Sequence, residues 1–128
     1  MNLLLDTHAF IWMSGAPDRL SPQVRGLLED ETNAVSVSMV SYWEMAIKIG
    51  LGKLDLGPDW MRRLQSFMHD NTISSLPIRS EHCTALVSLP FHHRDAFDRM
   101  LVAQSQSEKM CLVSRDASLS QYAIECIW

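Results

Sequence analysis

Short apolar runs typical of β-strands alternate with helical patterns along this chain, and this alternation limits the fold more than any other feature. The runs cover residues 2–5, 34–37, 72–78, 110–114 and 123–127. Such alternation is typical of βαβ units, in which helices pack on a parallel sheet. The sequence therefore predicts an open α/β sandwich.

Helical patterns occupy the segments between these runs. The clearest begins with Ser21 as its N-cap residue and Pro22 at the first helical position. Further helices are predicted in segments 38–52, 58–71, 80–89 and 95–109. The chain has no internal repeat or long linker, and 128 residues with 47% hydrophobic content can bury one continuous core. We therefore expect a single domain over residues 1–128.

The charge and hydropathy of the chain exclude several classes of protein. A formal net charge of -4 is opposite to that of a protein that holds nucleic acid by bulk electrostatics, so a polyanionic substrate would require local basic groups or a metal. The long charge-free run 32–43 is shorter than the roughly 18 residues that a membrane-spanning helix needs. The apolar start of the chain lacks a basic region and is interrupted by Asp6, so we interpret it as mature protein rather than a secretory signal.

The cysteines and histidines show no spacing typical of a disulfide framework or a zinc site. Cys83, Cys111 and Cys126 are scattered and odd in number, without a C-x-x-C pair. This usage favours the reducing cytoplasm. The five histidines also lack a metal-binding spacing such as H-E-x-x-H.

Two carboxylates follow predicted strands directly. Asp6 comes after the first strand with Thr7 beside it, and Asp116 follows the strand in "CLVSRD", which contains Ser114. In open α/β sheets the functional crevice lies outside the carboxyl ends of the strands, so both side chains are expected at that edge. Each of them alone could equally be the cap of the next helix.

Two other acids lie in apolar surroundings. Glu44 stands in "MVSYWEMAIKIG", where Lys48, one turn later, offers an i,i+4 ion pair. Asp98 lies on a helix that has no charge over residues 100–107 and is expected to be buried around most of its circumference. An unpaired carboxylate there would cost several kcal/mol or become neutral, and metal coordination would remove this penalty.

Asp95 precedes Asp98 by about one turn and has two interpretations. It can start the helix and pair with Arg99 at i+4, or it can contribute to a metal site.

Four carboxylates in one cleft require cations among them, and hard oxygen ligands select Mg²⁺ or Mn²⁺ rather than zinc. One or two such ions can activate a water and neutralise the charge that develops on a phosphodiester. Two divalent ions would offset the charges of the four candidate ligands, which are Asp6, Glu44, Asp98 and Asp116.

The motifs around these acids resemble those of PIN-domain nucleases of the VapC-like toxin type. The segments are "LLLDTHAFIW", "SYWEMAIKIGLGKL", "HHRDAFDRMLVAQS" and "LVSRD" followed by "YAIECIW", in the order of the family and across the whole chain. The resemblance implies a parallel five-stranded sheet flanked by helices on both faces. It also implies a Mg- or Mn-dependent endoribonuclease that hydrolyses RNA with a metal-activated water and is the toxin of a type II toxin–antitoxin pair.

The resemblance assigns roles to individual residues. Thr7 and Ser114 match hydroxyl positions that support the metal site, and Asp95 matches the subgroup pattern D-P-F-D. Ala96 departs from that pattern by replacing its proline, which is expected to reduce the rigidity of the first helical turn rather than alter the chemistry. The four metal-binding and catalytic acids of the family match Asp6, Glu44, Asp98 and Asp116.

Basic residues near these acids are candidates for contacts with RNA phosphates. They are Lys48, Arg99 and Arg115, and each could instead form an ion pair with a neighbouring acid or be plainly solvated.

The partners implied by the family are a second copy of the chain and an antitoxin protein whose C-terminal segment lies along the toxin. Four aromatic residues could line the antitoxin groove or pack in the core: Phe10, Trp12, Trp43 and Trp60.

Two other phosphoryl-transfer classes require residues that this chain lacks. A phosphatase of the haloacid-dehalogenase type needs a second aspartate where His8 stands, and a receiver module needs paired acids after the first strand. A PIN-like module that binds RNA or a partner without catalysis remains the alternative to the nuclease.

Overall fold

The computed structural model describes residues 1–128, and its centre is one sheet of five parallel strands in the order β3-β2-β1-β4-β5. The pairings place Leu5 beside Val37 on one side and Val113 on the other. The strands are β1 (Asn2–Leu5), β2 (Ala34–Ser38), β3 (Ser74–Leu76), β4 (Cys111–Val113) and β5 (Cys126–Ile127). The predicted α/β fold with a parallel five-stranded sheet is confirmed.

Each predicted strand exists, although three are shorter than their apolar runs. β1 has the predicted bounds, whereas β3 covers only three residues of the predicted run 72–78. Thr72 has a positive φ of 55° in the turn before β3, and Pro77 after it has no N–H to donate to a neighbouring strand. The apolar run is therefore longer than the paired segment.

All the predicted helices are present. The predicted cap of the second helix is confirmed, since the Ser21 hydroxyl accepts a hydrogen bond of 3.1 Å from the Val24 N–H. The helices are α1 (Thr7–Gly15), α2 (Pro22–Glu29), α3 (Met39–Gly50), α4 (Trp60–Asp70), α5 (Ser80–Val87) and α6 (Ala96–Glu108), with 3₁₀ turns η1 (Pro17–Arg19) and η2 (Ala117–Gln121). None of them is long and apolar enough to cross a membrane.

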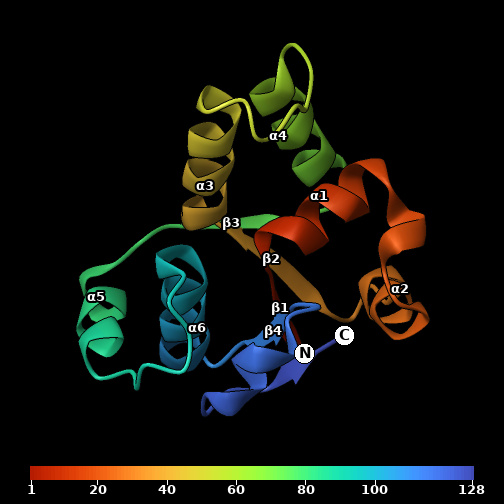
Figure 1. Ribbon diagram of the computed structural model, residues 1–128. Helices are drawn as coiled ribbons and strands as arrows, with labels where there is room; N and C mark the ends of the chain where they lie inside the picture. The colour runs from red at the N-terminus through yellow and green to blue at the C-terminus, as the bar shows by residue number, and fades with distance from the viewer.

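The helices cover both faces of the sheet. Figure 1 shows α5 and α6 on one side and α1, α2 and α4 on the other. Side chains alternate along β1, so that Leu3 and Leu5 pack with α1, α2 and α4, whereas Leu4 packs with α6. A strand buried on both faces is apolar at every position, which explains the continuous run that begins the chain.

The order of the strands determines where a site can form. After β1 the chain continues on one side to β2 and β3, and it later returns on the other side of β1 as β4. The carboxyl ends of β1 and β4 therefore flank a topological switch point, which is where ligands bind in open α/β folds. The residues that follow Leu5 and Val113 are positioned at this point.

Candidate active site

Asp6 is the first residue beyond β1, and the sheet fixes its backbone. Its N–H donates to the carbonyl of Val113 at 3.0 Å, and its carboxylate accepts a hydrogen bond of 2.8 Å from the Ala9 N–H at the start of α1. The capping interpretation is therefore correct. Burial raises the pKa of Asp6 above its usual value, and the nearby charge of Glu44 raises it further, against hydrogen bonds from Ser114 and Ala9 that lower it.

Glu44 reaches the same region from α3, and it is buried. The Thr7 hydroxyl donates to its Oε1 at 2.5 Å, and Lys48 Nζ lies 2.6 Å from its Oε2. The predicted i,i+4 ion pair is thus present, and the Glu44 contact raises the pKa of Lys48. Thr7 also lies 3.0 Å from the Ser41 hydroxyl, so it links α1 to α3 beside Asp6.

Asp98 lies in the first turn of α6, where its N–H donates to Asp95 Oδ1 at 2.9 Å. The expected burial of this helix is confirmed by the five consecutive buried residues 101–105. Burial, followed by the charges of Asp95, Asp6 and Glu44, raises the pKa of Asp98 to about 7. Acids from three separate segments therefore lie near one another.

Asp116 lies at the end of the segment that follows β4, and it is the most exposed of these acids. Its Oδ1 accepts hydrogen bonds from the Ser118 N–H at 3.0 Å and the Ser118 hydroxyl at 2.6 Å, which caps η2. These bonds, with the Ser118 hydroxyl first, lower the pKa of Asp116. Ser114 supports the same turn, because its hydroxyl accepts from the Asp116 N–H at 3.1 Å.

His93 is a site residue that the sequence did not indicate. Its Nε2 lies 3.0 Å from Asp116 Oδ2 and 3.6 Å from Asp98 Oδ2, and one ligand atom from each of these three residues fits within 4.8 Å of the others. The sequence test for histidines considered zinc spacings alone. The position of His93 in the chain could have indicated it, because His93 lies two residues before Asp95 in the motif "HHRDAFDR".

The donor set fits a hard divalent cation. Oxygen atoms of several carboxylates converge. One of these carboxylates is that of Asp98, whose pKa is raised to about 7 by burial and by its acidic neighbours. A divalent ion removes that repulsion, and carboxylate ligands are those that Mg²⁺ and Mn²⁺ prefer. Asp95 is the N-cap residue of α6, as the helix-start interpretation predicts. Its charge also contributes to the rise in the pKa of Asp98.

The basic candidates differ in their surroundings. Arg99 is buried, and its Nη1 donates to the carbonyl of Pro90 at 2.8 Å and lies 3.3 Å from the Tyr122 hydroxyl. Its guanidinium also stacks on the Phe91 ring, with 4.2 Å from Cζ to the centroid. This side chain holds the loop before α6, and its contact with RNA phosphate stays a prediction. Lys48 pairs with Glu44, whereas Arg115 is exposed.

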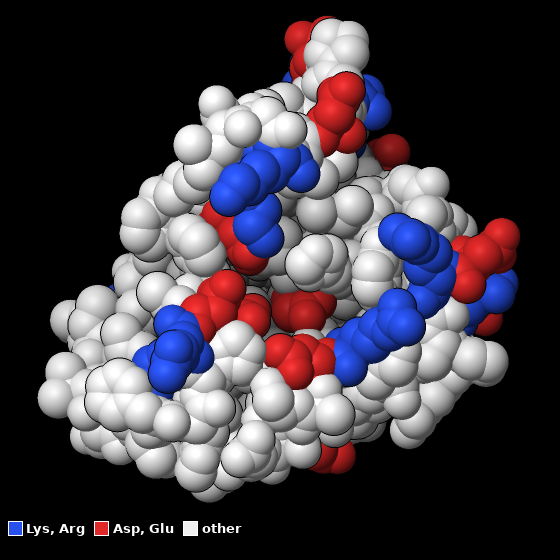
Figure 2. Space-filling model, viewed as in Figure 1, with Lys and Arg blue, Asp and Glu red and all other residues white.

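The charge distribution on this face is uneven. Figure 2 shows acidic side chains gathered around a central hollow, with lysine and arginine side chains around them. A ring of positive charge outside an acidic centre can hold a polyanion even when the net charge is negative.

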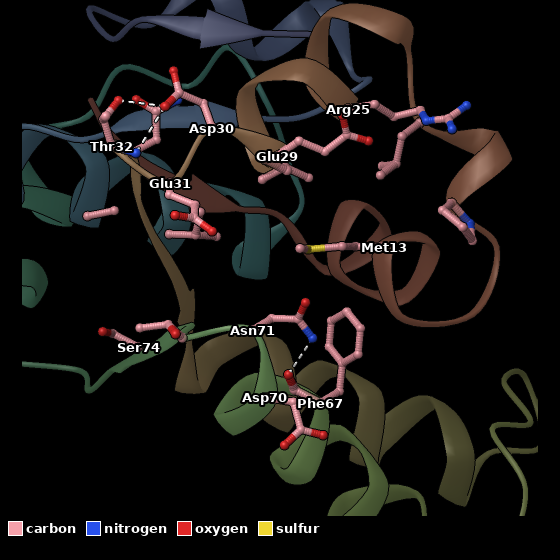
Figure 3. A pocket seen from close by; sticks show the side chains of 17 residues that line it. Met13, Arg25, Glu29, Asp30, Glu31, Thr32, Phe67, Asp70, Asn71 and Ser74 are labelled. Carbon is pink, nitrogen blue, oxygen red and sulfur yellow. Dashed lines mark hydrogen bonds between the residues drawn. The ribbon is translucent and has the colours of Figure 1, made fainter.

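A cavity lies away from these acids. It has a volume of about 1060 Å³, and residues at the starts of β2 and β3, Ala34 and Ser74, help to line it, at the opposite edge of the sheet from Asp6. Figure 3 shows Glu29, Glu31 and Asp70 around it. None of the four predicted acids lines this cavity.

Comparison with known proteins agrees with this fold. A chain in the crystal structure of VapBC2 from Rickettsia felis, bound to a DNA fragment from its promoter, matches with a TM-score of 0.74 at 13% identity, covering 98% of this chain and 97% of that one. A chain of DNA-bound VapBC from Salmonella typhimurium matches with a TM-score of 0.71 at 11% identity, covering 98% and 96%. A chain of FitAcB from Neisseria gonorrhoeae matches with a TM-score of 0.60 at 18% identity, covering 98% of this chain and 96% of that one.

These low identities establish a common fold. No curated protein sequence matches significantly. The family profile of the PIN domain matches residues 3–125, from the first strand nearly to the last residues. This chain therefore belongs to the PIN-domain family.

Proposed function

We propose that this protein is a Mg²⁺- or Mn²⁺-dependent endoribonuclease and the toxin component of a toxin–antitoxin pair. The observation that carries the proposal is the convergence of acids from distant segments at the switch point between β1 and β4. The metal ligands would be Asp6, Glu44, Asp98 and Asp116, holding one or two ions. Membership of the PIN-domain family supports nuclease chemistry at this position.

Each side chain has a distinct task in this proposal. Asp6 is held by the sheet and by the start of α1, so its carboxylate has a fixed direction. Thr7 fixes Glu44 by donating to Oε1, and Lys48 offsets part of the charge of Glu44 without an ion. When bound, a divalent ion would lower the pKa of a water and stabilise the charge that develops on the phosphodiester. Arg115 is exposed and would contact phosphate.

The test is cleavage of structured RNA by the purified protein, followed by sequencing of the product ends. We expect cleavage with Mn²⁺ or Mg²⁺ and complete loss with EDTA, with restoration when the ion is added back. Cleavage that persists in EDTA would contradict the metal-dependent mechanism. Failure to bind Mn²⁺ in a titration would instead favour a module that binds RNA or a partner without catalysis.

Two surfaces support two protein partners. Exposed Met39, Trp43, Ile47 and Leu51 recur at every fourth residue and form an apolar stripe on α3, which supports a homodimer. A separate groove of about 630 Å³ lies between α1, η1 and α4, and Trp12, Trp60 and Arg19 are among the residues that line it.

The groove is suited to an antitoxin segment with apolar and acidic side chains. The ring centroids of Trp12 and Trp128 lie 5.6 Å apart, and the Arg19 Cζ lies 5.3 Å from the centroid of the Trp12 ring. The groove therefore combines aromatic and cationic surface. The matched structures of VapBC are complexes, which supports a protein partner for this chain. Phe10 is fully buried and belongs to the core instead.

Two variants test these surfaces and serve as controls for each other. Trp43→Arg is expected to convert a dimer to a monomer while leaving the antitoxin bound, and Arg19→Glu is expected to weaken antitoxin binding while leaving the dimer intact. Light scattering measures the first property, and co-purification with the product of a small neighbouring gene measures the second. A Trp43→Arg protein that stays dimeric would contradict the assignment of the stripe.

A further inference from the structure

His93 approaches the carboxylates with a ring whose tautomer is fixed by the backbone. The Asp95 N–H donates to His93 Nδ1 at 3.0 Å. A backbone N–H can only donate, so Nδ1 is an acceptor and the neutral imidazole carries its proton on Nε2. The Nε2–H then points at Asp116 Oδ2, which lies 3.0 Å away.

This arrangement does not fit a histidine that ligates the metal. The lone pair on Nδ1 is used by Asp95, and Nε2 carries the proton, so neither nitrogen is free to coordinate. Ligation through Nε2 would require the imidazole to release the Asp95 N–H. The ring is instead placed as a hydrogen-bond donor to a carboxylate.

Asp116 is the acid that most needs such a donor. Its side chain is 43% exposed, compared with 23% for Asp98, and it is the N-cap residue of η2, shortly after a strand of three residues. Asp6 and Glu44 are buried and are held by a sheet and a helix. His93 joins the loop before α6 to the segment after β4 and spans 23 residues of sequence.

The donor is also electrically suitable. A lysine or arginine at this place would add a fixed positive charge beside the candidate metal site and repel a divalent ion. An imidazole whose Nδ1 accepts the Asp95 N–H orients the oxygen through Nε2 without such a group. Each carboxylate oxygen can accept at two positions, so the bond to Nε2 leaves one position on Oδ2 for a metal.

We propose that His93 is the positioning residue for Asp116, fixing the orientation of this metal-binding carboxylate through the hydrogen bond from its Nε2–H. This inference rests on the proposed metal site. It assigns to His93 neither coordination of the ion nor contact with the RNA.

The test compares the Mn²⁺ affinity of three variants by calorimetric titration at a constant pH near 7.5. Loss of a residue that orients a ligand typically weakens metal binding by about 10-fold to 100-fold, so His93→Ala is expected to fall in that range. His93→Gln places an amide N–H close to the position of Nε2, where it can donate to Asp116. This variant is therefore expected to recover most of the Mn²⁺ affinity. His92→Ala is the matched control, because His92 lies on the same loop but makes an edge-to-face contact with Tyr122, with 5.1 Å between the ring centroids.

The possible results distinguish this inference from the proposed function. Wild-type affinity in His93→Ala would overturn the role of His93 while leaving the metal site intact. Tighter binding in His93→Ala would also overturn it, since the imidazole would then compete with the ion. An absence of Mn²⁺ binding in the wild type would contradict the proposed metal site itself. Thermal unfolding in EDTA identifies any variant that has lost its fold. If His93→Ala does not fold, the Mn²⁺ affinity of His93→Gln decides whether the inference holds.

Discussion

Replacing Asp6 with asparagine is expected to reduce metal-dependent RNA cleavage by about 10³-fold or more. A divalent ion contributes several kcal/mol of transition-state stabilisation, and each 1.36 kcal/mol corresponds to a factor of about ten. Asparagine retains the oxygen that caps α1, which now accepts from the Ala9 N–H at 2.8 Å, but it removes the negative charge that holds the ion. The measurement is the initial rate of cleavage in saturating Mn²⁺.

The same variant should fold normally, which separates loss of chemistry from loss of structure. Burial raises the pKa of Asp6, so an uncharged side chain there is not expected to lower the free energy of unfolding. Asp18→Asn is the matched control, since it removes the same charge from a side chain that is 98% exposed on η1. Equal activity of Asp6→Asn and Asp18→Asn would contradict the assignment of Asp6 as a ligand.

Replacing Asp98 with asparagine is expected to stabilise the metal-free protein at pH 8 while abolishing its activity. The folded state keeps a proton on Asp98 up to about pH 7, whereas an ordinary aspartate releases it near 3.8. Between these values the folded state binds more protons than the unfolded state, so this group's stabilising contribution is present below about pH 4 and is lost as the pH rises through about 7. Asparagine remains neutral over the whole interval.

The size of this effect can be bounded. A shift from 3.8 to about 7 corresponds to about 4 kcal/mol for a fully buried group, and the partial exposure of the side chain, 23%, reduces the expected gain to about 2 kcal/mol. Urea unfolding in EDTA at pH 5 and pH 8 measures it, with Asp18→Asn as the reference.

In the presence of metal, the wild type should be more stable than Asp98→Asn. Added Mn²⁺ binds the folded wild type and raises its unfolding temperature, whereas Asp98→Asn is expected to respond weakly. The interpretation fails if the metal-free wild type is equally stable at pH 5 and pH 8 and gains nothing from the substitution. The carboxylate cluster is thus expected to destabilise the protein without an ion, as charged groups gathered for a function often do.

Patterns within short segments gave reliable predictions. The continuous apolar run of β1 predicted a strand with the observed bounds, because a strand buried on both faces is apolar at every position. Ser21 and Pro22 predicted the start of α2 by the same local chemistry. The lengths of β3 and β5 were less predictable, since pairing with a neighbour decides where a strand ends, and an apolar run does not specify that neighbour.

The roles of Arg99 and His93 show where local reasoning ends. Spacing suggested an ion pair between Arg99 and Asp95, yet the guanidinium donates to the Pro90 carbonyl and lies beneath Phe91. His93 contacts Asp116, which is 23 residues away in the chain. Both contacts depend on how the loop before α6 folds over the sheet, and no hydrophobic period encodes that path.

The sequence by itself determined the parallel α/β architecture and the carboxylates that end its strands, because hydrophobic periodicity and strand-end position are local properties of the chain. Only the tertiary structure decided that β4 lies beside β1, so that Asp6 and Asp116 follow neighbouring strands at that edge, and that the His93 imidazole contacts both Asp116 and Asp98. The physical reason is that mutual repulsion, burial and orientation of charged groups arise from distances across the fold, and these distances exist only after the sheet has assembled.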